Sequence, residues 1–234
     1  MSFRVKACAA TVAAACVLFT PAAMASPGIS HAPVQVTGKQ LKNGLLPPLH
    51  ILPGYTTIFS DNSGGKLERS GLLHIPTLKC SDFWAFLGTG DSLGETAQAE
   101  STSAAKSAAA PVHEFVDQSV YQFASASAAS TFFNQVSAKF KSCRSVSVKS
   151  NGSTLKHQVH SRTALRVGGH QSLKLVEFFT DSKAPGPPLV TDVLLTVYGD
   201  DFYMISTDLL NVSSPKPSQS SLMLKLILRV RALK

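Results

Sequence analysis

The chain has 234 residues, of which 44% are hydrophobic, and it carries a formal net charge of +8. The apolar content is enough for a buried core, so we expect a globular protein of one large domain or two small ones. The basic surplus is typical of a solvated surface, and the chain lacks the interleaved arginine and aromatic residues of a nucleic-acid surface, which argues against nucleic-acid binding.

Residues 1–25 have the pattern of a signal peptide. Arg4 and Lys6 precede an apolar run over residues 7–19, and Ala23-Met24-Ala25 supplies the small residues that signal peptidase recognises. We therefore expect cleavage before Ser26 and a secreted, extracellular protein.

Two alternatives for this N-terminus fit the sequence less well. A membrane anchor needs about 20 apolar residues, whereas this run is shorter and is interrupted by Pro21. A lipoprotein needs a leucine-rich sequence before its modified cysteine, and Cys16 instead follows three alanines. The sequence favours the free secreted form.

The cysteines predict one disulfide. Cys8 and Cys16 leave with the signal peptide, so only Cys80 and Cys143 remain to pair in an oxidising compartment. They do not form a Cys-x-x-Cys motif, which favours a structural bridge over a redox pair. A bridge that closes so long a loop stabilises a fold by about 4 kcal/mol in the chain-entropy estimate.

The first elements after the signal peptide are predicted to be short. Residues 26–40 show little periodicity and predict a flexible leader before a single domain over residues 41–234. Residues 41–46 predict a short helix or a turn that a pair of prolines ends. Residues 54–60 predict a strand, and the Asp-Asn-Ser-Gly-Gly sequence at residues 61–65 predicts a turn after it.

The next part of the chain gives a weaker pattern. Cys80 opens a segment that predicts a short helix ending at Gly88 or Gly90. Residues 95–111 are mainly alanine, serine and threonine, and an edge strand, a poor helix and a flexible loop all remain open. Residues 113–123 alternate enough to favour a strand.

The clearest helix covers residues 125–143. Its apolar residues recur about every four positions and form one stripe, which predicts a buried face made of Ala128, Ala129, Phe132, Phe133, Val136 and Phe140. Ser125 or Ser127 can serve as N-cap, and Lys139 and Lys141 suit the negative end of the helix dipole. Aromatic residues at this spacing indicate core packing and not a cofactor site.

From residue 144 onward the pattern has a period of two, as in strands. Strand-like segments cover residues 146–148, 155–167, 172–180, 190–198 and 202–207. The connections between them are too short for the crossover helices of a parallel sheet, so they predict an antiparallel meander. Its buried face is expected to include Leu173, Leu175, Phe178, Phe179, Val193, Leu195 and Val197.

The last segment, residues 218–234, fits a strand and a helix. Its leucines alternate, but Leu222, Leu226 and Val230 also form a helical stripe. A Ser/Gln-rich start and four basic residues favour a C-terminal helix lying on the sheet; the four are Lys225, Arg229, Arg231 and Lys234. These basic residues are also a weak candidate for contact with an anionic surface. The elements together predict an α+β fold, in which helices flank an antiparallel β-sheet meander with one disulfide.

The histidines do not predict a metal site. His157 and His160 are three residues apart on a predicted strand, where their side chains face opposite sides. That spacing does not chelate one ion, and the other histidines are isolated or lie in irregular N-terminal segments. We therefore expect no metal and no cofactor.

Motifs for covalent catalysis do not occur either. The chain has no Gly-x-Ser-x-Gly sequence and no glycine-rich phosphate loop before a helix. A carboxylate pair for a hydrolase remains open among Asp181, Asp192, Asp200, Asp201 and Asp208. The adjacent Asp200 and Asp201 are explained more simply as the turn of a hairpin. We expect no catalytic residues and a protein that is not an enzyme.

One stretch resembles a known family. Residues 120–143 resemble the PknH-type extracellular sensor domain of actinobacteria, in which a strand ending in an aromatic residue leads into a Ser/Ala-rich helix. Phe140-Lys-Ser-Cys143 stands where that family usually has Trp-x-x-Cys. Pro53-Gly54-Tyr55 and Cys80 are also similar to exported relatives of the domain. The family commonly has four cysteines in two bridges, whereas this chain retains two of them.

The resemblance implies an antiparallel sheet flanked by helices, with a cleft that binds an extracellular ligand, but it implies no particular binding residues. The leading hypothesis is a secreted, non-enzymatic ligand-binding or sensor-like module of the cell envelope, without a kinase domain. Its partner would be an extracellular small molecule or an envelope polymer. The alternatives are an exported hydrolase acting on wall or lipid material and a structural envelope protein.

Overall fold

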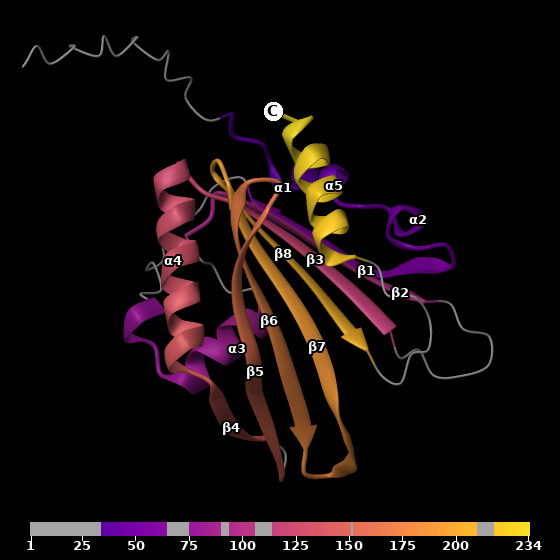
Figure 1. The fold of residues 1–234 in the computed structure, drawn as a ribbon. Coiled ribbons are helices and arrows are strands. Elements are labelled where there is room, and N and C mark those ends of the chain that lie inside the picture. The colour runs from indigo at the N-terminus through magenta and orange to yellow at the C-terminus, as the bar shows by residue number, and fades with distance from the viewer. Residues whose placement is uncertain (1–33, 65–74, 90–93, 106–113, 151, 210–217) are drawn as a thin grey trace, which may run out of the picture. The chain divides into compact units, whose positions relative to one another are not determined.

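An antiparallel sheet organises the chain (Figure 1). The structure is a computed structural model that describes residues 34–64, 75–89, 94–105, 114–150, 152–209 and 218–234. Within these residues the sheet has eight strands in the order β1-β2-β3-β8-β7-β6-β5-β4. Strands β1–β3 and β4–β8 each pair in chain order, and the two sets meet where β3 pairs with β8. The predicted signal peptide lies outside the described residues.

The strands are Tyr55–Gly64 (β1), Ala97–Ala105 (β2), Glu114–Gln122 (β3), Ser145–Ser150 (β4), Ser153–Val167 (β5), His170–Asp181 (β6), Ala184–Tyr198 (β7) and Asp201–Leu209 (β8). Strands β4–β8 form the meander that the sequence predicts from residue 144 onward. The α+β fold class is therefore confirmed.

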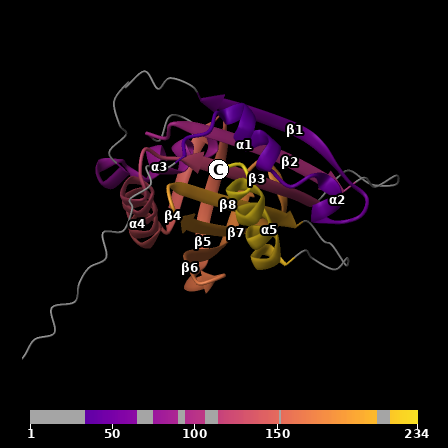
Figure 2. The same cartoon turned by 90° about the horizontal axis from the view of Figure 1, so that it is seen from above.

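Helices cover both faces of the sheet (Figure 2). They are Gly38–Gly44 (α1), Pro48–Ile51 (α2), Cys80–Thr89 (α3), Ala126–Ser142 (α4) and Gln219–Arg231 (α5), with a 3₁₀ turn at Ile75–Thr77 (η1). Residues of α1 and α5 share one buried cluster with the sheet, and residues of α3 and α4 share the other. We call these two sides of the sheet the α5 face and the α4 face.

Helix α4 confirms the helix predicted for residues 125–143. Ser125 is its N-cap, and its side chain accepts a 3.1 Å hydrogen bond from the backbone N–H of Ala128. The buried side of the helix consists of Ala129, Phe132, Phe133, Val136 and Phe140. These side chains pack on β7 and β8, so the apolar stripe is the core of the α4 face.

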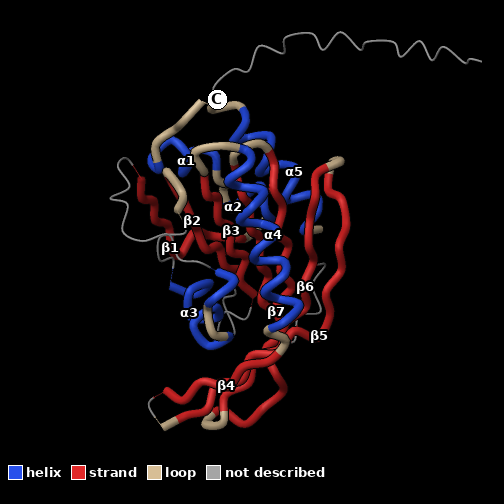
Figure 3. The backbone as a smooth tube through the Cα atoms, turned by 90° about the vertical axis from the view of Figure 1, so that its left-hand side faces the viewer, coloured by secondary structure: helices blue, strands red, loops and turns tan. Residues whose placement is uncertain are grey.

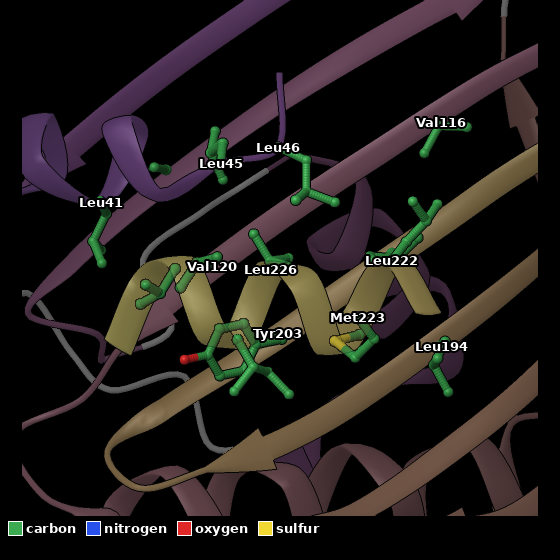
Figure 4. Close-up of a cluster of buried hydrophobic side chains, with 14 of the residues drawn as sticks. Leu41, Leu45, Leu46, Val116, Val120, Leu194, Tyr203, Leu222, Met223 and Leu226 are labelled. Atoms are coloured by element: carbon green, nitrogen blue, oxygen red, sulfur yellow. The ribbon is translucent and has the colours of Figure 1, made fainter. Parts of the chain in front are cut away.

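Helix α5 resolves the ambiguity of the C-terminal segment. Leu222, Met223 and Leu226 point from α5 toward the sheet, where they meet Leu194 and Tyr203 (Figure 4). The three helix residues are at most 2% exposed. The segment is helical, and not a strand as the alternation of its leucines would allow, because the helical stripe buries the apolar residues of the α5 face.

The sequence between β1 and β2 was predicted less accurately. The strand β1 continues to Gly64, through most of the predicted turn at residues 61–65. Asp61 and Gly64 pair with Glu100 and Ala97 of β2, and this ladder outweighs the local turn preference. The residues left open at 95–111 include β2, which is an internal strand between β1 and β3 and not an edge strand.

The small residues of β2 give it no clear strand pattern in the sequence. The same residues let α1 approach the sheet. Ala97 and Ala99 are at most 2% exposed beneath α1. A Cβ atom added at Gly38, the first residue of α1, would lie 2.1 Å from the Ser63 carbonyl oxygen. Helix and strands therefore pack backbone to backbone, which requires small residues on both sides.

The flexible leader predicted for residues 26–40 extends too far. Val36 is buried, and its N–H donates a 2.9 Å hydrogen bond to Gln122 Oε1. Gln35 Nε2 donates to the Phe123 carbonyl oxygen at 3.1 Å, and Thr37 caps α1. Residues 34–40 are thus part of the fold, because buried polar groups of β3 need these partners.

Candidate functional site

A cavity of about 380 Å³ opens on the α4 face. It is lined by Trp84 of α3, Phe140 of α4, and His157, Glu177, Phe179, Leu189, Thr191, Val193, Leu195, Met204, Ser206 and Asp208 of strands β5–β8. The lining is mainly apolar with a few polar groups, which is typical of small-molecule sites of this volume. We call it the α3 cavity.

The Cys80–Cys143 disulfide holds α3 at this cavity. Cys80 is the first residue of α3 and Cys143 is the C-cap of α4, so the predicted bridge joins the two helices. The rings of Phe83 and Trp84 lie 5.0 and 5.5 Å from the ring of Phe140, both edge to face. Bridge and rings together hold α3, the helix that carries Trp84, beside β4 (Figure 3).

Trp84, His157 and Phe179 form an aromatic wall of the cavity. The ring centroids of Trp84 and His157 are 4.9 Å apart, and those of His157 and Phe179 are 4.6 Å apart. His157 and Phe179 are register partners on β5 and β6. Burial lowers the pKa of His157 below its usual value, so its imidazole is neutral at neutral pH.

Glu177 is the residue whose environment is least expected. Its side chain lies in a cavity wall formed largely by apolar residues. No hydrogen bond or ion pair connects its carboxyl group to another described residue. Burial and, to a smaller extent, the nearby carboxyl group of Asp208 raise the pKa of Glu177 to about 8. In the free protein Glu177 is therefore mostly protonated at neutral pH.

A second carboxyl group lies in the same row of the sheet. The register places Glu177, Thr191 and Asp208 side by side on β6, β7 and β8. Burial raises the pKa of Asp208, although Thr191 Oγ1 donates a 2.6 Å hydrogen bond to Asp208 Oδ1. The next acidic group, Asp117 of β3, accepts a 3.1 Å hydrogen bond from Ser206 Oγ. One side of the cavity is therefore acidic, and no lysine or arginine is among its described lining residues.

The comparison with protein families identifies the central part of the chain. Residues 88–186 match the family model of the PknH-like extracellular domain. This part of the chain is therefore similar to a PknH-like extracellular domain. The match includes all of α4 and the residues 120–143 that carry the sequence resemblance, which is thereby confirmed.

Solved structures extend the likeness to the fold of the whole described domain. The extracellular domain of PknH from Mycobacterium tuberculosis matches with a TM-score of 0.57 at 15% identity, over 84% of this chain and 97% of that one. An uncharacterized protein from Mycobacterium smegmatis gives a TM-score of 0.36 at 9% identity, over 76% of this chain and 90% of the other. A search of curated proteins finds no significant match. The chain thus has the fold of the first of these structures.

Two further properties of the described residues bear on the site. None of its described helices is long and apolar enough to cross a membrane. Nor do its described residues group three or more histidine, cysteine or acidic side chains where they could hold a metal ion. His157 and His160 lie on opposite faces of β5, as the strand alternation predicts: His157 contacts Trp84, while His160 stacks on Phe178 at 4.6 Å.

The candidate aspartates for hydrolysis lie at separate places in the described domain. Asp208 lines the α3 cavity. Asp181 accepts hydrogen bonds at the β6–β7 turn, where Ser153 is one of the donors. Asp192 pairs with Lys174 at 3.6 Å and is not part of the described lining. The structure therefore does not bring these three aspartates together.

Asp200 and Asp201 lie at the β7–β8 turn, as predicted, and they also bind Lys234. Lys234 Nζ is 2.6 Å from Asp200 Oδ1 and 2.9 Å from Asp201 Oδ2. The hydroxyl group of Tyr203 donates a 3.0 Å hydrogen bond to Asp201 Oδ2. These groups form a structural ion cluster beside α5 and not a pair of catalytic carboxylates.

The other basic residues of α5 are also largely used within the domain. Arg229 donates hydrogen bonds to backbone carbonyl groups at the end of α1. The Arg231 guanidinium lies 4.9 Å from the ring centroid of Tyr198. Lys225 is exposed. The predicted basic surface therefore keeps little of its charge free for an anionic partner.

Glu177 was not singled out from the sequence, although β6 contains a signal for it. It has the same parity as Leu173 and Phe179, which face the α4 side. An acidic residue at an inward position of an apolar strand indicates a buried carboxyl group. Phe178, predicted to be buried on that face, instead lies on the opposite face against His160.

Proposed function

We propose that this protein is an exported module that binds a small extracellular molecule in the α3 cavity and breaks no bond in it. The observation that carries the proposal is the cavity itself, which combines an apolar lining with two carboxyl groups and an aromatic wall. A PknH-like extracellular domain is a sensor-type module, and a ligand-binding role agrees with that family.

The polar groups of the cavity favour binding over nucleophilic catalysis. The hydroxyl groups of Ser206 and Thr191 donate to Asp117 and Asp208, so neither is hydrogen-bonded to a histidine base. The ring of His157 contacts aromatic rings instead. A serine or threonine nucleophile would need that missing hydrogen bond.

A fluorescent probe tests the binding function. We expect 1-aminoanthracene, a neutral aromatic molecule, to bind the purified protein saturably with one site per chain. Leu189→Phe narrows the cavity and should weaken binding by about tenfold, the loss expected when about 1.4 kcal/mol of contact energy is removed. Val190→Phe, on the opposite face of β7, is the matched control and should leave the affinity unchanged. Unsaturable binding, or equal affinity for both variants and the wild type, would contradict a binding cavity.

An exported hydrolase is the second candidate function, because Glu177 and Asp208 place two carboxyl groups with raised pKa values in one cavity. A screen with esterase, glycosidase and peptidase substrates tests it. Turnover that Asp208→Asn abolishes, and that Asp181→Asn outside the cavity leaves intact, would favour the hydrolase. We expect no turnover above background from the wild-type protein.

A further inference from the structure

The charge of the α3 cavity differs from that of the chain as a whole. The protein has a formal net charge of +8. The cavity nevertheless has two carboxyl groups, Glu177 and Asp208, and no basic side chain other than His157 among its described lining residues. Asp117 of β3 acts electrostatically on Asp208, and it is also acidic. The cavity is thus a local acidic site in a basic protein.

The helices contribute aromatic side chains to the cavity, and both carboxyl groups come from the sheet. Trp84 and Phe140 come from the helices, and Phe179 and Leu189 face each other on β6 and β7. Glu177 and Asp208 lie in one row of the sheet with Thr191 between them. A ligand that fills the cavity therefore meets aromatic rings from the helices and carboxyl oxygens from the sheet.

An anionic ligand and a purely apolar ligand fit this arrangement poorly. Above the pKa of Glu177, an anion would lie beside two carboxylates, and like charges in such a site cost several kcal/mol. A hydrocarbon would leave the Glu177 carboxyl group buried without any partner, which is also unfavourable. A cation compensates both groups, and the aromatic rings of the wall attract cations as well.

We propose that the α3 cavity binds an amine with an apolar body, whose ammonium group pairs with Glu177 and Asp208 while its hydrocarbon part packs against Trp84 and Phe140. This inference rests on the proposed binding function and specifies the chemical class of the ligand. An amine of this kind pairs with the carboxyl groups and also packs against the apolar wall. A small inorganic cation lacks the apolar part, and a fatty acid lacks the positive charge.

Binding of such a ligand has a defined pH dependence. The ammonium group requires the ionised form of Glu177, whose pKa in the free protein is about 8, so binding below this pH displaces a proton. The other titratable groups that face the site act in the same direction. Acid also protonates Asp208, whose pKa is raised by burial, and places a positive charge on His157. The affinity should therefore rise as the pH increases.

Three ligands of equal chain length provide the test: octylammonium, octanol and octanoate. Trp84 is the only tryptophan of the chain, so its fluorescence reports occupancy of the cavity directly. At pH 9 an alkylammonium is still charged, since amines of this type have a pKa of about 10.4. We expect octylammonium to bind at least about tenfold more tightly than octanol, and octanoate to bind most weakly. The affinity for octylammonium should fall by about tenfold or more at pH 6.

Two substitutions locate the effect. Glu177→Gln should reduce the preference for octylammonium over octanol to less than about twofold, because it removes the carboxylate but keeps the shape. Asp208→Asn should reduce it in part, which provides a second variant if the first is unstable. Glu100→Gln is the control, since Glu100 lies on β2 outside the described lining of the cavity. It should keep the full preference.

The outcomes separate this inference from the proposed function. If octanol or octanoate binds as tightly as octylammonium, the preference for a cation is wrong, although the cavity still binds small molecules. The same holds if 1-aminoanthracene binds and octylammonium does not, or if Glu177→Gln and Asp208→Asn keep the preference. If neither octylammonium nor 1-aminoanthracene binds, the binding function itself is overturned.

Discussion

Glu177 and Lys234 show two opposite ways in which this fold accommodates a charged residue. The Lys234 ammonium group lies between Asp200 and Asp201, so each charge has a partner. Glu177 has no such partner and responds by a raised pKa. A paired charge stabilises the fold, whereas an unpaired one is available to a ligand.

The first prediction concerns the stability of the ligand-free protein as a function of pH. The pKa of Glu177 is about 8 in the folded state, whereas the ordinary value for a solvated glutamate is 4.5, so the folded state holds the proton over this interval. The contribution of Glu177 to the stability of the fold is therefore greatest below about pH 4.5, and it is lost as the pH rises toward 8. Because one pKa unit corresponds to about 1.4 kcal/mol, we expect a loss of about 2–4 kcal/mol.

Urea unfolding at pH 5 and pH 9 measures this loss. Glu177→Gln should lack this part of the pH dependence and should be more stable than the wild type at pH 9. Asp82→Asn, an exposed substitution on α3, is the control and should follow the wild type. A wild-type protein and a Glu177→Gln variant with parallel pH profiles would show that the carboxyl group is solvated.

The second prediction concerns the ion cluster of Lys234. The side chain of Asp201 is 2% exposed, so Lys234→Met leaves it without its cation in a buried position. We expect a loss of about 3–5 kcal/mol at neutral pH, the range found when one member of a buried pair is removed. Burial raises the pKa of Asp201 despite the ammonium group, so the deficit should shrink as acid protonates this carboxyl group. Chemical denaturation at pH 7 and pH 4 checks both statements.

Lys225→Met is the matched control, because Lys225 is exposed on the same helix. It should change the unfolding free energy by less than about 0.5 kcal/mol. A similar cost for both lysine substitutions would mean that the cluster of Lys234 contributes nothing specific.

Among the elements, the pair α3 and α4 decides whether the cavity exists. Helix α4 has the long apolar stripe and packs on β7 and β8 by itself. Helix α3 is shorter and is connected to α4 by the disulfide and by the rings around Phe140. The wall formed by Trp84 should therefore depend on the bridge more than the rest of the domain does.

The third prediction follows from this difference. Replacing both Cys80 and Cys143 by serine should lower the unfolding free energy by about 4 kcal/mol, the chain-entropy value for a loop of this length. The affinity for 1-aminoanthracene should fall as well, because Trp84 is no longer held over the cavity. Thermal unfolding and probe titration measure the two effects. Reduction of the wild type should reproduce them and leave the double variant unchanged; a wild type insensitive to reductant would contradict a structural bridge.

At the scale of the whole molecule, the elements with a strong periodicity of apolar residues could be predicted from the sequence. Helix α4 and the meander follow from repeats of about four and of two residues, because one buried face determines each of them. The predicted disulfide followed from compartment and number alone. The strand β2 was not predictable, since its alanines and serines serve the close approach of α1, which is a tertiary contact.

The α3 cavity could not be predicted from the sequence either, for a different physical reason. Glu177, Thr191 and Asp208 are separated by 14 and 17 residues, and only the register of three strands brings them into one row. A shift by one residue would turn each side chain to the opposite face. Turn geometry sets that register, and local composition does not reveal it.

The last prediction concerns export of the protein. Disulfides form and persist in oxidising compartments, so the Cys80–Cys143 bridge agrees with a location outside the cytoplasm. The first described residues already belong to the fold, since Val36 is bound by Gln122. Cleavage before Ser26 would therefore remove none of the described residues and would not disturb the domain. We expect protein purified from the culture medium to begin at Ser26 and to carry no lipid, as N-terminal sequencing and intact mass would show.

Replacing Ala25 by a large residue should block cleavage, because signal peptidase requires a small side chain there. A chain that begins at a lipid-modified Cys16 would instead identify an anchored lipoprotein, with the same domain presented at the membrane surface.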